Sequence, residues 1–194
     1  MNKKEYITLA GVFVLVFFLV SCAKPPTEEM NNAVTALTRA ENDADAVTYA
    51  GNVLVRARDT LAQMHIEAEA KRYDAARALA AEVISAADKA IADGRAASER
   101  ARSEAANLVS SLKTPLAETE AALKAARGVQ KIKLDFNALT REFEQARSEA
   151  GEAEQSLLAG NYQNAREKAL NVRSSLGGID IQISDAVRAA SRKQ

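Results

Sequence analysis

The chain has 194 residues, and its 26 basic side chains balance 26 acidic ones, so its formal net charge at pH 7 is zero. This balance, without a run of Lys or Arg, argues against a nucleic-acid partner. Alanine occurs 41 times, Trp is absent, and Gly and Pro are scarce, which is typical of helices around a thin apolar core. We therefore predict an all-α protein, an elongated antiparallel bundle of two long helical hairpins with four to five helices.

The first 21 residues have the pattern of a secretory signal. Lys3 and Lys4 precede an unbroken apolar run over 12–20, and Ser21 and Cys22 follow it. A membrane-spanning helix needs about 20 apolar residues, so this run is too short to cross a bilayer comfortably. We predict a signal peptide over 1–21. The alternative is an uncleaved N-terminal anchor in which the cysteine has no role.

The residues around the predicted cleavage point also resemble a known signal. Leu19-Val20-Ser21-Cys22 resembles the lipobox of bacterial lipoproteins, and Cys22 is the only cysteine. The resemblance implies that the Cys22 sulfur is acylated and that residues 22–27 form a lipidated tether. About two acyl chains are needed for stable anchoring, which lipoproteins have. Ala23 and Lys24 resemble the start of outer-membrane lipoproteins of enteric bacteria, so we expect an exported envelope protein facing the periplasm.

For the rest of the chain we predict one helical-bundle domain over 28–190, followed by a tail over 191–194. Its hairpins are expected at about 28–112 and 115–190. Thr27, followed by two glutamates, suits a helix start. Asn42, Asp43 and Asp45 could cap a second helix. Apolar residues keep the helical period beyond them, which favours a kinked helix or two nearly collinear helices and leaves the continuity open.

Further helix boundaries are expected from Lys71 onward. Lys71-Arg72-Tyr73-Asp74 predicts a tight turn into a long helix ending near Leu112. Thr114 is expected as the N-cap of the next helix, with Pro115 at its first position. Gly128 and Asp135 mark a break, and Gly160-Asn161 predicts a C-cap and turn.

Two of these turns resemble each other. Tyr73 and Arg77 recur as Tyr162 and Arg166 at an offset of 89 residues. One interpretation is that each Tyr packs across its own turn, with its hydroxyl at the rim. The other is that Tyr73, Arg77, Tyr162 and Arg166 form a shared interaction edge.

Two stretches resemble known families. Ala159–Ala165 resembles the helix-to-helix turn of a tetratricopeptide repeat, although an offset of 89 residues does not fit that family's repeat of about 34. The stretch from Met30 to about Gly94 resembles an uncharacterised alanine-rich domain of envelope lipoproteins, which is sometimes found ahead of OmpA-like peptidoglycan-binding modules. The residues that carry this likeness are Tyr49, Ala50, Leu54, Ala57, Leu61, Tyr73, Ala76, Leu79, Ala80 and Ala87. This resemblance implies an envelope location and no known chemistry.

Catalytic patterns are weak throughout the sequence. His65 is the only histidine, whereas a zinc site or a catalytic triad needs several placed partners. Asp43-Ala44-Asp45 lacks the glycine and closing glutamate of a calcium loop. The carboxylates of the second half are interpreted as a solvated face with i,i+4 ion pairs; they are Glu118, Glu120, Glu142, Glu144, Glu149, Glu152 and Glu154. We predict no enzyme activity, no cofactor and no metal.

The predicted function is a lipid-anchored, non-catalytic binding or scaffolding module. Its expected partners are the membrane, through acylated Cys22, and either another protein or a second copy of the chain. Long helices with alanine seams suit a further helix docking alongside. Two alternatives stay open: a carrier of a lipid or small apolar ligand for an envelope transporter, and a mechanical spacer.

Overall fold

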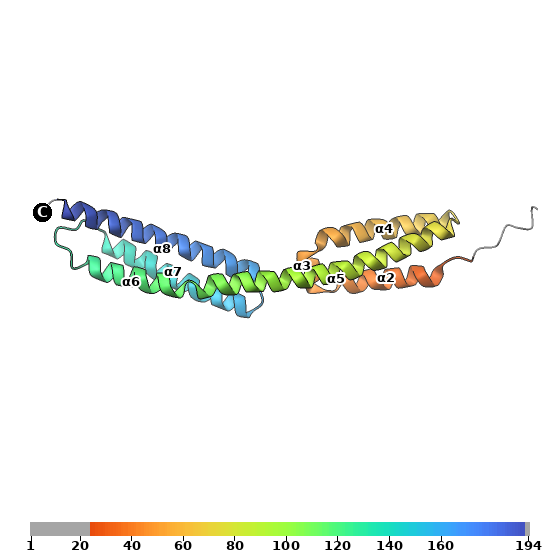
Figure 1. Cartoon of the computed structure of the whole chain (residues 1–194), viewed down its shortest axis with the longest axis horizontal. Helices are drawn as coiled ribbons and strands as arrows, with labels where there is room; N and C mark the ends of the chain where they lie inside the picture. The colour runs from red at the N-terminus through yellow and green to blue at the C-terminus, as the bar shows by residue number, and fades with distance from the viewer. Residues whose placement is uncertain (1–23, 193–194) are drawn as a thin grey trace, which may run out of the picture. The chain divides into compact units, whose positions relative to one another are not determined.

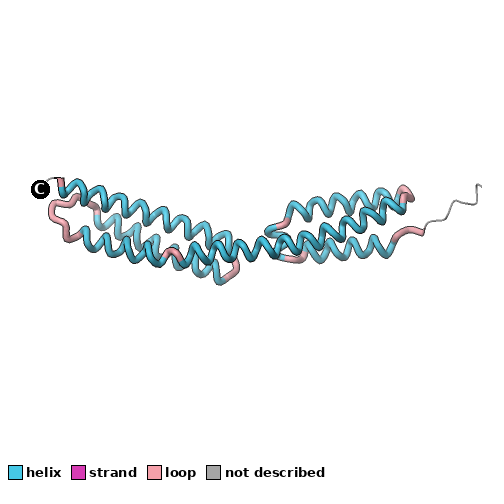
Figure 2. The backbone as a smooth tube through the Cα atoms, in the orientation of Figure 1, coloured by secondary structure: helices cyan, strands magenta, loops and turns pink. Residues whose placement is uncertain are grey.

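The structure, a computed structural model, describes residues 24–192 and confirms the all-α class (Figure 1). Figure 2 shows helices joined by short loops, with no strand in the described part of the chain. Within residues 24–192 the structure has seven helices in place of the expected four to five, because the chain also breaks near Asn42, near Ala50 and between Ala126 and Phe136. The helices are α2 (Thr27–Glu41), α3 (Ala44–Tyr49), α4 (Gly51–Glu69), α5 (Tyr73–Ser110), α6 (Lys113–Ala126), α7 (Phe136–Leu158) and α8 (Tyr162–Ser191).

The described helices group into two compact units, unit 1 up to Gly94 and unit 2 from Arg95. Helix α5 crosses this boundary without a break and contributes residues to both hydrophobic cores. The single-domain boundaries over 28–190 stay a prediction, and each unit is described below by itself.

In unit 1 the chain reverses direction where the sequence favoured a kinked or collinear helix, so that expectation was wrong. Helix α4 runs back in the direction opposite to α2, with the short α3 at the reversal (Figure 1), and α2 and α4 contact each other. The Asp43 carboxylate accepts a hydrogen bond from the Ala46 N–H at 2.8 Å and starts α3, as expected of a cap. Ala50 then leaves the helical region at φ −123° and ψ 24°. The apolar period continued because both helices bury a face against one core.

Unit 1 has an alanine-rich core and one backbone contact of unusual closeness. Ala33, Ala57, Ala76 and Ala80 are fully buried in it, and Met64 is its largest fully buried side chain. A Cβ added to Gly94 in α5 would lie 2.6 Å from the Ala46 backbone nitrogen. The absence of a side chain at Gly94 is therefore what lets α5 approach α3.

The start of the described chain is held against unit 1. Pro26 is buried, and α2 begins at Thr27, as predicted. The guanidinium of Arg77 lies 2.9 Å from the Asp74 carboxylate and 3.3 Å from that of Glu29, and donates a 3.4 Å hydrogen bond to the Lys24 carbonyl. Arg77 thus joins the beginning of α2 to the beginning of α5.

The two tyrosine turns lie where the sequence predicted them and share one backbone geometry. Tyr73 begins α5 and Tyr162 begins α8. Arg72 N–H bonds the carbonyl five residues earlier at 2.9 Å, and Asn161 N–H does the same at 2.9 Å. These are Schellman C-caps, which need a left-handed residue before that N–H. Gly160 takes this role at φ 78°, whereas unit 1 uses Lys71 at φ 59°.

Unit 2 combines the end of α5 with α6, α7 and α8. Helices α7 and α8 form a tight antiparallel hairpin, and α6 packs mainly on α8. The Asp135 carboxylate caps α7 by accepting hydrogen bonds from Asn137 and Ala138 N–H at 3.0 Å each, so the predicted break from Gly128 to Asp135 is confirmed.

The predicted N-cap at Thr114 was wrong. Helix α6 begins at Lys113, and its N-cap, Leu112, has helical dihedral angles and no side-chain cap bond. Pro115 cannot donate a backbone hydrogen bond, so the turn before it is weakened. The hydroxyls of Ser110 and Ser111 bond carbonyls three residues back at 3.0 and 2.7 Å. The break is therefore a local distortion in a nearly continuous path.

One stretch of α5 belongs to neither core. No residue over 95–104 is buried, and this stretch holds only Ala, Arg, Ser and Glu. These side chains have good to moderate helix propensity but add little packing. This segment therefore depends on local helix stability.

Candidate functional site

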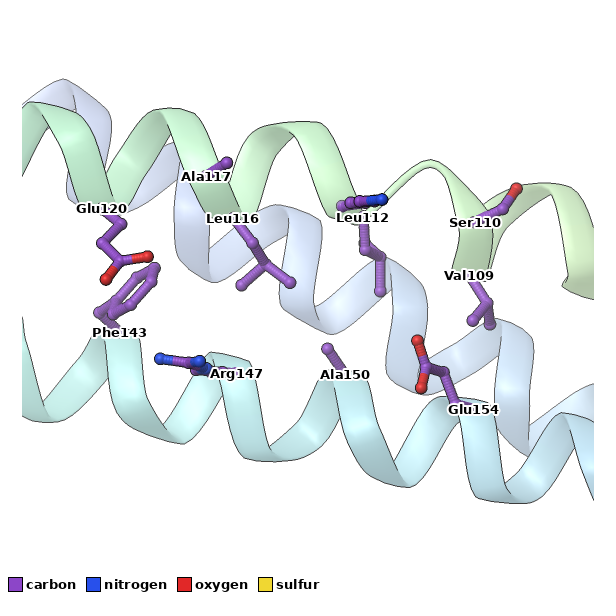
Figure 3. A pocket seen from close by; sticks show the side chains of 11 residues that line it. Val109, Ser110, Leu112, Leu116, Ala117, Glu120, Phe143, Arg147, Ala150 and Glu154 are labelled. Atoms are coloured by element: carbon purple, nitrogen blue, oxygen red, sulfur yellow. The ribbon is translucent and has the colours of Figure 1, made fainter.

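Unit 2 has a groove between the α5–α6 junction and α7. Helix α7 packs closely along α8, whereas its contact with α6 is much less extensive. The resulting hollow has a volume of about 450 Å³. Figure 3 shows Val109, Leu112 and Leu116 pointing across it toward α7. We call this hollow, with its extension described next, the α6–α7 groove.

The groove continues along the same two helices. A second hollow of about 230 Å³ shares Glu120 and Phe143 with the first. A third, of about 420 Å³, shares Arg127, Thr140 and Glu144 with the second. Along α7 its charged lining runs from Arg141 to Glu154, which is about 20 Å of helix. This length suits an extended occupant more than a compact small molecule.

The floor of the groove is apolar and its rims are charged. Leu112 and Phe143 are buried at the floor, whereas Leu116 is half-buried and Ala117 is exposed. Five basic and three acidic side chains line the groove: Lys113, Lys124, Arg127, Arg141, Arg147, Glu120, Glu144 and Glu154. The lining therefore carries a net positive charge of two.

None of these eight charged groups forms a salt bridge with the residues that the structure describes. The α7–α8 seam differs, since the Lys168 ammonium donates to Glu152 at 2.6 Å and this hydrogen bond raises the pKa of Lys168. Arg127 is held by other means, because it donates to the Thr140 hydroxyl at 2.9 Å and its guanidinium lies 5.6 Å from the Phe136 ring centre. The groove thus presents charged groups without salt-bridge partners in this part of the chain beside an apolar floor, the pattern of a docking surface.

Sequence reasoning missed this groove. It interpreted the glutamates as one solvated face with i,i+4 pairs, but Glu152 pairs with Lys168 on α8, and Glu149 accepts a 3.3 Å hydrogen bond from Asn171. Glu120, Glu144 and Glu154 line the groove instead. The spacing of α6 from α7 depends on packing against α8, which no local pattern reveals.

The predicted interaction edge is divided between the two units. Tyr73 and Arg77 belong to unit 1, and Arg77 is already bonded to Glu29 and Asp74. Tyr162 and Arg166 belong to unit 2, where Tyr162 is half-buried against the core and Arg166 is exposed. A shared edge stays a prediction. Each tyrosine is half-buried beside its turn.

Two further residues that the sequence analysis considered are Cys22 and His65. Cys22 lies outside the described residues, so its acylation stays a prediction. His65 is exposed on α4. Between residues 24 and 192, no three or more His, Cys, Asp or Glu side chains gather as a metal site would require. Over the same residues, no helix has the length and apolar character needed to span a bilayer.

Comparison with known proteins identifies one domain. Residues 28–107 match the family model described as a domain of unknown function, DUF4398. This match confirms the uncharacterised domain expected over 30–94, with wider bounds that take in α2, α3, α4 and most of α5. No curated protein and no solved structure matches the chain. The matched stretch ends before Val109, the first residue that lines the groove.

Proposed function

We propose that this protein is a non-catalytic docking module of the bacterial cell envelope, held to a membrane by acylation at Cys22. The observation that carries the docking role is the α6–α7 groove, with its apolar floor and unpaired charged rims. The envelope location is supported by the apolar run over 12–20 and the Leu19–Cys22 sequence.

The groove favours a helix as its ligand. Its charged lining covers about 20 Å along α7, close to four helical turns. A bound helix would pack as a fourth helix beside α6, α7 and α8, as in helix-in-groove recognition. An acyl chain would gain nothing from three glutamates on the rims, so the carrier alternative is less well supported.

Photo-cross-linking in intact cells tests the docking role. A benzoylphenylalanine placed at exposed Ala117 lies in the groove, and the same residue at Ile181, 63% exposed on α8, is the control. We expect a discrete protein adduct from position 117 that is absent from position 181. No adduct at 117 would refute the docking role, and a lipid adduct there would support a carrier instead.

The anchor has its own test. Cells fed radiolabelled palmitate should label the wild-type chain, and a Cys22→Ser variant should lose both the label and the membrane fraction. A Cys22→Ser chain that stays in the membrane fraction would favour the uncleaved-anchor alternative, while a wild type without label would refute acylation.

A further inference from the structure

We infer that the occupant of the α6–α7 groove is the outer face of α4 from a second copy of this chain. This inference rests on the proposed docking role of the groove. It names the partner as a second copy of this chain, whose contact residues lie within the matched stretch of residues 28–107.

Helix α4 presents an unusual combination of exposed residues on the side away from its core. Val55 and Ile66 are 51% and 53% exposed, and Asp59, Ala62 and Glu69 are also exposed. The spacings of four, three, four and three place all five residues on one side of the helix. We call these five residues the α4 outer face.

The charge of the α4 outer face complements the groove. Asp59 and Glu69 are its only charged residues, and neither forms a salt bridge within the described chain. The groove offers five basic and three acidic side chains, also without salt bridges. Docking would place two carboxylates over a net positive surface and cover Val55 and Ile66.

The lengths agree as well. From Val55 to Glu69 the α4 outer face spans 14 residue steps, or about 21 Å of helix. The charged groove lining from Arg141 to Glu154 spans about 20 Å along α7. A helix of this length can contact the groove over its whole charged lining.

Other exposed apolar groups fit less well. Leu170 and Ile181 are 39% and 63% exposed on one side of α8, but the residues between them on that side, Ser174 and Gly177, carry no charge. Leu158 stands alone at the end of α7. The α4 outer face, unlike these groups on α7 and α8, joins a pair of exposed β-branched residues to acidic groups that form no salt bridge within residues 24–192.

The donor face and the acceptor groove are different surfaces, so the contact is heterologous. Such contacts close as reciprocal dimers or rings, or continue as open assemblies. In each case the mass of the purified protein exceeds that of a monomer, and the contact weakens as salt screens the charges.

The test uses two tagged forms of the full chain, co-expressed so that a cross-link between copies carries both tags. Benzoylphenylalanine replaces exposed Ala62, at the centre of the α4 outer face. We expect a doubly tagged product whose cross-linked peptide lies within 109–154. Asp59→Lys combined with Glu69→Lys should reduce it about tenfold or more, as charge reversal across an interface does. Ala117→Trp, which obstructs the groove from an exposed position, should do the same.

Matched controls separate docking from folding. Ile181→Lys adds a positive charge at a residue that is 63% exposed and lies outside both surfaces, so it should leave the yield unchanged. Circular dichroism should show unchanged helicity for every variant, because all the substituted residues are exposed.

The outcomes distinguish this inference from the proposed function. A cross-link within one copy, no cross-link, or a monomeric mass overturns the inference. If position 117 still captures a different protein, the docking role survives with another partner. If neither position 62 nor position 117 yields a product, both proposals fail.

Discussion

Gly94 offers the sharpest test of the packing in unit 1. Replacing a glycine by alanine inside a helix ordinarily stabilises the fold by about 0.5–1 kcal/mol, because the unfolded chain loses conformational freedom. At Gly94 the added Cβ would lie 2.6 Å from Ala46 N and 2.7 Å from both Ala46 Cα and Asp45 C. These neighbours are backbone atoms, so α3 or α5 must move to relieve the overlap.

The expected size of the effect follows from these distances. Forcing extra volume into a packed contact costs about 1–3 kcal/mol. Set against the helix-propensity gain, Gly94→Ala should lower the unfolding free energy of unit 1 by about 1–2 kcal/mol. For a domain of this size, that loss corresponds to a fall in melting temperature of roughly 4–15 °C.

Gly151 is the matched control, since it lies inside α7 with nothing within 4 Å of its added Cβ. Gly151→Ala should raise stability by about 0.5–1 kcal/mol. Hydrogen exchange read by mass spectrometry assigns each change to its unit, because two units need not unfold together. If Gly94→Ala stabilises unit 1 as much as Gly151→Ala stabilises unit 2, the close approach of α3 to α5 is refuted.

Four further predictions concern single features. Lys71→Gly should stabilise unit 1 by about 1 kcal/mol in denaturant titration, because it relieves a left-handed residue, and a loss would contradict the Schellman geometry. Thr119 is fully buried with an unpartnered hydroxyl, so Thr119→Val should raise the unfolding free energy of unit 2 by about 1–2 kcal/mol; a clear loss would reveal a hidden partner. The hydrogen bond from Arg72 lowers the pKa of Glu67. The pair therefore stabilises unit 1 fully above the pKa that Glu67 has in the unfolded chain, and this stabilisation is lost as the pH falls through the lower pKa of the folded state. Glu67→Gln should therefore flatten the acid side of the stability profile of unit 1, and an unchanged acid side would count against the pair. Amides over 95–104 should exchange faster than those of the α5 residues in either core, and equal protection would show that these residues are packed.

Local chemistry in the sequence predicted most helix boundaries. Asp43, Asp135 and the two tyrosine turns carry caps that act over three to five residues, and a single sequence contains all of that information. The reversal at α3 escaped prediction because α2 and α4 bury faces of one core, so the apolar period runs through the turn. Periodicity reports which face is buried and not the direction of the chain.

The groove depends on distances between helices that are far apart in the sequence. Glu120 on α6 and Arg147 on α7 come together only because both helices pack against α8. Their charges looked like an ordinary solvated surface when read along the chain. Only the ion pairs of the folded chain distinguish Glu152, which pairs with Lys168, from Glu154, which has no salt bridge among the described residues.

The buried Pro26 has a consequence for the proposed membrane anchor. If the chain is anchored at Cys22, only three residues lie between the acylated cysteine and a proline packed into unit 1. Four residue steps of fully extended chain reach about 14 Å at most. The end of unit 1 that bears Pro26 and Arg77 would then stay within about 14 Å of the lipid headgroups, whereas α2 and α4, at 15 and 19 residues, are each longer than that distance. Such an anchor would therefore fix the position of one end of unit 1 at the bilayer surface.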